Sequence, residues 1–125
     1  MDTTNIEVLI VDDYAIIRTI LKTQLRKMGY SHICEAEDGF AAYEILQANR
    51  IDLIISDWNM PRMTGYELLQ AVRNEMNLSR VKFIMVTAET SPDNIQMALD
   101  ADVDQFIMKP FTMEVLEEKI NQVIH

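Results

Sequence analysis

The chain has 125 residues, a length that suits one domain with a single hydrophobic core. Its 20 acidic residues outnumber 11 lysines and arginines, and the net charge of −9 argues against nucleic acid or an anionic membrane as the main partner. The N-terminus lacks a signal-peptide pattern, no apolar stretch approaches the roughly 18 residues of a membrane span, and Cys34 is the only cysteine, so we expect a cytoplasmic protein.

Short apolar runs alternate with stretches of helical periodicity along the whole chain. The predicted strands are, in chain order, residues 8–11, a weaker run near residue 33, and residues 53–55, 83–86 and 106–108. Continuously apolar runs of this length are typical of parallel strands covered by helices on both faces. We expect the apolar residues at helical spacing to pack in the core: Ile16, Ile17, Ile20, Leu21, Leu25 and Met28; Ile45 and Leu46; Leu68 and Val72; and Leu116, Ile120 and Val123.

Three of the predicted helices carry start signals. Asp38 can cap the second helix, and Thr64 with Glu67 forms a capping-box pattern before the third. The pair at residues 91–92, Ser-Pro, supplies a cap and a first-turn proline for the fourth. The alternation predicts an α/β fold, a flavodoxin-like doubly wound sheet of five parallel strands with five helices. We expect the strand order 2-1-3-4-5, one of the few that right-handed crossovers permit.

Polar residues follow the carboxyl ends of four predicted strands. Asp12 and Asp13 come after the first strand, and Asp57 ends the third. Thr87 ends the fourth strand and Lys109 the fifth. Sites in open α/β sheets form at this edge, where the winding direction reverses, and here that point lies between strands one and three. The sequence therefore predicts a crevice that combines carboxylates from two distant segments with a hydroxyl and an ammonium group.

Three crowded carboxylates repel one another unless a cation neutralises them, and oxygen ligands with water favour Mg²⁺. Lys109 would add positive charge for an anion. Zinc is disfavoured because the two histidines, His32 and His125, have no further ligands at suitable spacing. The three glycines form no phosphate-binding loop. Residues 100–104 alternate in acids like a calcium loop but lack its glycine and its final acid, so we expect a solvated helix end.

Four motifs resemble those of response regulator receiver domains of the CheY chemotaxis type: LIVDD at residues 9–13, ISDWNMP at 55–61, MVTAE at 85–89 and MKPF at 108–111. The resemblance extends over nearly the whole chain, as one receiver domain over residues 1–125 without an effector domain. It implies that Asp57 accepts a phosphoryl group and that Asp12, Asp13, Asp57 and the carbonyl of Asn59 arrange Mg²⁺.

The resemblance also implies that Thr87 and Lys109 contact the phosphoryl oxygens, with a cis peptide before Pro110. It implies a histidine kinase as phosphodonor and a rate of phosphoryl loss tuned by Asn59 and Glu89. The switch pair would be Thr87 and Phe106, acting on the face formed by helix four, strand five and helix five. The output would be binding by a monomer to a partner protein, such as a flagellar motor switch protein.

Some positions depart from the family pattern. Phe106 stands where the family often has Tyr, and Asp102 and Gln105 stand where close relatives favour Gly. Residues 90–92, Thr-Ser-Pro, lack the lysines expected from chemotaxis members. Two alternatives stay open beside a stoichiometric, self-dephosphorylating switch: a relay intermediate that passes its phosphoryl group to another protein's histidine, and a metal-dependent phosphatase. A phosphatase of this kind is expected to carry a DxDxT pattern at the first strand, and the sequence lacks it.

Overall fold

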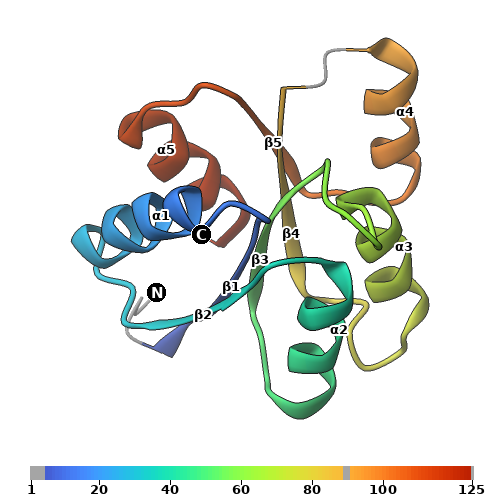
Figure 1. The fold of residues 1–125 in the computed structure, drawn as a ribbon, viewed down its shortest axis with the longest axis horizontal. Coiled ribbons are helices and arrows are strands. Elements are labelled where there is room, and N and C mark those ends of the chain that lie inside the picture. Colours follow the sequence, from blue (N-terminus) through green and yellow to red (C-terminus); the bar gives the residue numbers. More distant parts are fainter. Residues whose placement is uncertain (1–4, 89–90, 125) are drawn as a thin grey trace.

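The computed structural model describes residues 5–88 and 91–124 (Figure 1), and within them the chain forms five strands and five helices that alternate. The strands are β1 (Glu7–Val11), β2 (His32–Ala36), β3 (Leu53–Asp57), β4 (Lys82–Thr87) and β5 (Gln105–Met108). The helices are α1 (Ala15–Lys27), α2 (Gly39–Ala48), α3 (Gly65–Asn74), α4 (Pro92–Asp100) and α5 (Met113–Ile124). All strands pair in parallel in the order β2-β1-β3-β4-β5, which confirms the predicted topology.

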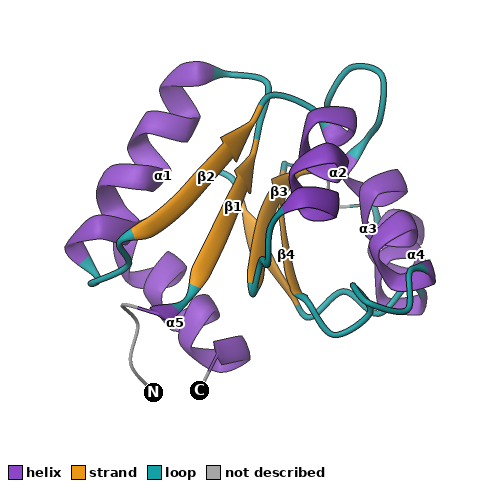
Figure 2. Cartoon of the chain, turned by 90° about the horizontal axis from the view of Figure 1, so that it is seen from below, coloured by secondary structure: helices purple, strands orange, loops and turns teal. Residues whose placement is uncertain are grey.

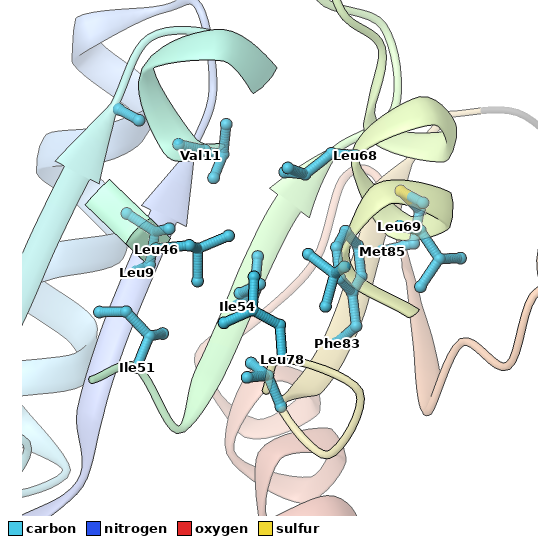
Figure 3. Packing of buried hydrophobic residues seen from close by; sticks show 14 of the residues in the cluster. Leu9, Val11, Leu46, Ile51, Ile54, Leu68, Leu69, Leu78, Phe83 and Met85 are labelled. Atoms are coloured by element: carbon cyan, nitrogen blue, oxygen red, sulfur yellow. The ribbon is translucent and has the colours of Figure 1, made fainter. Parts of the chain in front are cut away.

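Helices cover both faces of the sheet. Figure 2 shows α1 and α5 on one face and α2, α3 and α4 on the other. Successive side chains of β1 point to opposite faces, so Val8 and Ile10 join the core under α1 and α5 while Leu9 and Val11 join the core under α2 and α3 (Figure 3). This two-sided burial is the physical reason that β1, β3 and β4 each contain a continuous apolar run. No helix in the described part of the chain has the length and apolar character to span a membrane.

The prediction of the α1 core residues is wrong at two positions. Leu21 and Leu25 are buried, but Ile16 is 74% exposed and Ile20 is 44% exposed. Because each residue turns a helix by about 100°, Ile16 and Ile20 lie well to the side of the stripe that contains Leu21 and Leu25. The apolar stripe in the sequence is thus wider than the helix face that the sheet covers.

The predicted helix starts are confirmed in position. Asp38 accepts a hydrogen bond from a backbone N–H in the first turn of α2. Thr64 and Glu67 form both hydrogen bonds of a capping box at α3. At α4, Pro92 occupies the first turn as predicted, but the Ser91 side chain makes no capping hydrogen bond.

The acidic run after α4 is only in part the solvated end that we predicted. Asp100 is an exposed helix end, but Asp104 is bound on two sides. Its Oδ2 accepts a hydrogen bond from an Arg73 guanidinium nitrogen at 2.7 Å and one from the Phe83 backbone N–H at 2.8 Å. Asp102 has a positive φ of 64°, a backbone conformation that glycine adopts at no cost and that aspartate tolerates.

Candidate metal and phosphoryl-acceptor site

The three predicted carboxylates lie together at the carboxyl edge of the sheet. Asp12 directly follows β1 and Asp57 ends β3, and these strands are paired neighbours in the sheet. Asp12 is 1% exposed and Asp57 is 6% exposed. One carboxylate oxygen from each of Asp12, Asp13 and Asp57 can be chosen so that all lie within 4.8 Å of one another. The topology therefore brings together acids that are far apart in the sequence.

Lys109 lies beside two of these acids. Its Nζ is 3.1 Å from Oδ1 of Asp57 and 3.7 Å from Oδ2 of Asp12. The residue directly follows β5, and its backbone N–H donates to the carbonyl of Thr87 at the end of β4. The peptide between Lys109 and Pro110 is cis, as the resemblance implies. One ammonium group thus neutralises part of the negative charge of the site.

The other predicted site residues are distributed around this centre. Thr87 is buried at the end of β4, two strands from β1. Asn59 follows β3 with an exposed side chain, and Phe106 lies half-buried in β5, in register with Met85. Glu89 lies outside the described residues.

Hydrogen bonds orient the two buried carboxylates. Oδ1 of Asp12 accepts the backbone N–H of Tyr14 at 2.9 Å, and Oδ1 of Asp57 accepts that of Trp58 at 2.9 Å. The Arg18 guanidinium donates to the backbone carbonyl of Asp12 at 2.7 Å and to Oε1 of Glu35 at 2.9 Å. Arg18 thus ties α1 and β2 to the turn that carries the metal-site acids.

Our sequence analysis did not identify Arg18, nor two other residues at the site. Gly65 is one of the three glycines that form no phosphate-binding loop, and its backbone N–H donates to the Trp58 carbonyl at 2.8 Å. Arg62 lies in the loop between β3 and α3 and pairs with Asp38. A usable signal existed only for Arg18, a cation placed within an apolar helical stripe directly after the acids.

The electrostatics of the site centre on Asp57. Burial raises the pKa of its carboxyl above the ordinary value, and the neighbouring Asp12 acts in the same direction. The hydrogen bond and positive charge of Lys109, with the Trp58 N–H, oppose this rise in pKa but do not cancel it. Asp57 therefore holds its proton more tightly than an ordinary aspartate, and added positive charge would stabilise its charged form.

The residues present fit a hard divalent cation. The cluster offers only oxygen ligands, which Mg²⁺ prefers. Among the described residues, Oδ1 of Asp13 is one of the few buried side-chain atoms without a hydrogen-bond partner. A buried carboxylate oxygen without a donor is costly, and a cation at the cluster would satisfy it.

The raised pKa of Asp57 predicts how the stability of the metal-free protein depends on pH. Because the folded state binds this proton more tightly than the unfolded chain, Asp57 makes the free energy of unfolding fall as pH rises from about 4 through the raised pKa. Asp57→Asn removes this contribution. We therefore expect the stability difference, variant minus parent, to grow with pH in this window and then level off.

Urea denaturation of both proteins in a chelating buffer, in steps from about pH 4 to 7, measures this difference. Other carboxylates titrate in the same range, but they do so in both proteins and cancel in the comparison. A difference that stays flat or shrinks as pH rises would contradict the stated electrostatics of Asp57.

The chain matches known proteins over nearly its whole length. The model of the response regulator receiver domain family matches residues 8–121. The chain is 44% identical over 117 residues to the chemotaxis protein CheY of Pseudomonas aeruginosa, covering 94% of each chain. It is 39% identical over 119 residues to the chemotaxis protein CheY-3 of Vibrio cholerae, covering 95% of this chain and 92% of that protein.

A solved structure agrees with these sequence matches. The chemotaxis response regulator CheY4 of Vibrio cholerae superposes with a TM-score of 0.88 at 37% identity, covering 95% of this chain and 98% of that chain. Sequence and fold are thus similar over the same span, and the resemblance drawn from the four motifs is confirmed. The chain belongs to the response regulator receiver domain family.

Proposed function

We propose that the chain is a phosphorylation-dependent switch of a two-component system, with Asp57 as the acceptor of a phosphoryl group from a histidine kinase. The observation that supports this most strongly is the position of the Asp57 carboxylate, buried 3.1 Å from the Lys109 ammonium and beside two further carboxylates. A carboxylate nucleophile needs positive charge around the transferred group, and this arrangement can gather it.

In the proposed reaction, a carboxylate oxygen of Asp57 attacks the phosphorus of the donor's phosphohistidine. The new O–P bond forms as the N–P bond breaks, and the imidazole takes up a proton from solvent as it leaves. Lys109 neutralises phosphoryl oxygens, and the Thr87 hydroxyl donates a hydrogen bond to one of them. Mg²⁺, held by Asp12, Asp13, Asp57 and the carbonyl of Asn59, supplies charge neutralisation when bound.

The same groups favour loss of the phosphoryl group. Lys109 stabilises the charge that develops when water attacks the aspartyl-phosphate, so the domain resets itself. Asn59 and Glu89 tune this rate in the proposal. The chain acts stoichiometrically on itself rather than as an enzyme with an external substrate. We place it in the cytoplasm as a monomeric single receiver domain, with a relay intermediate as the alternative role.

The proposed output is a change of the face formed by α4, β5 and α5. Phosphorylation would draw Thr87 toward the phosphoryl group and vacate space for the Phe106 ring. This ring has no hydroxyl, so its burial leaves no unsatisfied polar group. The similarity to chemotaxis proteins of Pseudomonas aeruginosa and Vibrio cholerae favours a chemotaxis partner, such as a flagellar motor switch protein.

The chemistry of this face predicts the partner preference. Ile95 and Val103 are half-buried and Leu99 is exposed, so the face offers apolar contacts. Residues 91–93, Ser-Pro-Asp, offer no ammonium group to an acidic peptide. We expect the phosphate mimic beryllofluoride to strengthen binding to a partner on this face. We also expect weaker binding to the N-terminal peptide of a flagellar switch protein than a lysine-bearing relative shows.

The test is an affinity measurement of both proteins with that peptide, with and without beryllofluoride and Mg²⁺. Asp57→Asn is the control, because the mimic should have no effect on it. Equal, mimic-dependent affinities for the two proteins would contradict the interpretation of residues 90–92 as lacking the lysines that bind this peptide. If beryllofluoride leaves the affinity for the peptide unchanged, the result would contradict the proposed phosphorylation-dependent switch.

A further inference from the structure

Arg62 is a cation at the rim of the acidic site. It lies in the loop between β3 and α3, and its φ of 67° puts a non-glycine residue in the left-handed region. This backbone conformation costs free energy for arginine and needs compensation from the surroundings. The guanidinium forms an ion pair with Asp38 and lies 3.9 Å from Oε1 of Glu37. The loop after β3 is thereby tied to the loop after β2.

The partner of Arg62 is a fixed anion. The Asp38 side chain is 2% exposed and caps α2 through the backbone N–H of Ala41 at 2.8 Å. This hydrogen bond, with the Arg62 interaction, holds the pKa of Asp38 below its ordinary value although burial acts in the opposite direction. Asp38 therefore stays charged, and without Arg62 its charge would lack a cationic partner in the described residues.

The ion pair shares a pocket with one of the metal-site acids, Asp13. Asp13, Glu37, Asp38, Pro61 and Arg62 line one pocket of about 320 Å³. A cation that binds at Asp12, Asp13 and Asp57 therefore experiences the charges of Asp38, Glu37 and Arg62 at short range. Arg62 offsets two rim carboxylates that would otherwise add to the negative potential at the cluster.

We propose that Arg62 is a positioning residue that lowers the affinity of the Asp12–Asp13–Asp57 cluster for Mg²⁺ by neutralising Asp38 and Glu37 beside it. This inference rests on the proposed function, since it assumes that the cluster binds Mg²⁺. The expected effect is the opposite of the usual one: removal of the Arg62–Asp38 ion pair should raise the affinity for Mg²⁺. A purely structural role for Arg62 predicts the reverse, because a disturbed loop would displace Asn59 and weaken the site.

Arg62→Asn tests this sign. Asparagine tolerates a positive φ, so the loop conformation is retained while the charge is removed. We expect Mg²⁺ to bind about threefold to tenfold more tightly at low ionic strength, with a smaller gain at high salt. Titration calorimetry measures the affinity, and fluorescence of Trp58, the only tryptophan, gives a second readout beside Asp57.

Two further variants make the comparison specific. Arg80→Asn removes an exposed arginine just before β4, at the opposite edge of the sheet, and should leave the affinity unchanged despite the same change in net charge. Asp38→Asn keeps a good capping residue but leaves Arg62 without its main anion, so Mg²⁺ should bind more weakly. The double variant Asp38→Asn/Arg62→Asn should return close to the parent affinity.

The outcomes separate the inference from the function on which it rests. Tighter binding by Arg62→Asn and weaker binding by Asp38→Asn support the role of Arg62. Parent-like or weaker binding by Arg62→Asn, in a parent that does bind Mg²⁺, would overturn this inference alone. If Arg62→Asn does not fold, Asp38→Asn decides, and an unchanged affinity overturns the inference. A parent that binds no Mg²⁺ would overturn the metal site and this inference together.

Discussion

Gly65→Ala should strongly destabilise the fold and distort the site. A Cβ at this position would lie 2.2 Å from the backbone oxygen of Asp57, 2.9 Å from Sδ of Met85 and 3.0 Å from Cα of Trp58. Two of these atoms belong to the backbone, which cannot rotate away as a side chain can. We expect a loss of about 3 kcal/mol and a melting temperature lower by about 10 °C. The backbone of Asp57 must shift, so Mg²⁺ binding should weaken too.

Gly39→Ala is the matched control. Its added Cβ would meet Cβ, Cγ and Sδ of Met63 at 2.6–2.7 Å, so the loop that carries Met63 must shift, but none of these atoms belongs to the backbone of the metal-site strands. Thermal unfolding in a chelating buffer and calorimetry with Mg²⁺ compare both variants with the parent. A Gly65→Ala protein with the melting temperature and Mg²⁺ affinity of the parent would show that this close approach does not constrain the site.

The strand order was predictable because the apolar runs of single strands and the rules for connecting parallel strands favour the same fold. Each central strand contains a continuous apolar run of three or more residues, and this pattern requires helices on both faces, which parallel crossovers supply. The chain then has few ways to wind. Once that order is chosen, the ends of β1 and β3 are neighbours, so the meeting of Asp12, Asp13 and Asp57 follows without knowledge of any side-chain conformation.

The exposure of two isoleucines in α1 was predictable from the helical angle, but the prediction grouped residues by apolar character alone. At about 100° per residue, Ile16 and Ile20 lie on the far side of the helix from Leu21 and Leu25, and both are exposed. Periodicity alone could not show the paired state of Asp104 after α4, which is a tertiary property. Arg73, its partner, is 31 residues away in the sequence.

The residues that support the site escaped prediction because backbone geometry determines them. Gly65 matters through the close approach of Asp57, and Arg62 matters through a left-handed loop conformation that arginine rarely adopts. Neither feature has a sequence pattern of its own. The side chains that carry chemistry follow the strand ends and could be listed in advance, whereas the loop geometry that holds them could not.

Asp57→Asn should abolish phosphoryl transfer to the chain. Of the carboxylates in residues 5–88 and 91–124, Asp57 lies closest to Lys109, with Nζ at 3.1 Å from Oδ1, against 3.7 Å from Oδ2 of Asp12. An amide oxygen of asparagine is a poor nucleophile and carries no charge, so the substitution removes the acceptor with little change of shape. Asp100→Asn, at the exposed end of α4, is the control for loss of one carboxylate elsewhere.

The decisive measurement is the intact mass of the parent, Asp57→Asn and Asp100→Asn after incubation with a small acyl phosphate and Mg²⁺. The account predicts one added phosphoryl group on the parent and on Asp100→Asn, none on Asp57→Asn, and none on any of them when a chelator removes the metal. One phosphoryl group on Asp57→Asn at the parent's level, or a parent that stays unmodified with Mg²⁺ present, would contradict it.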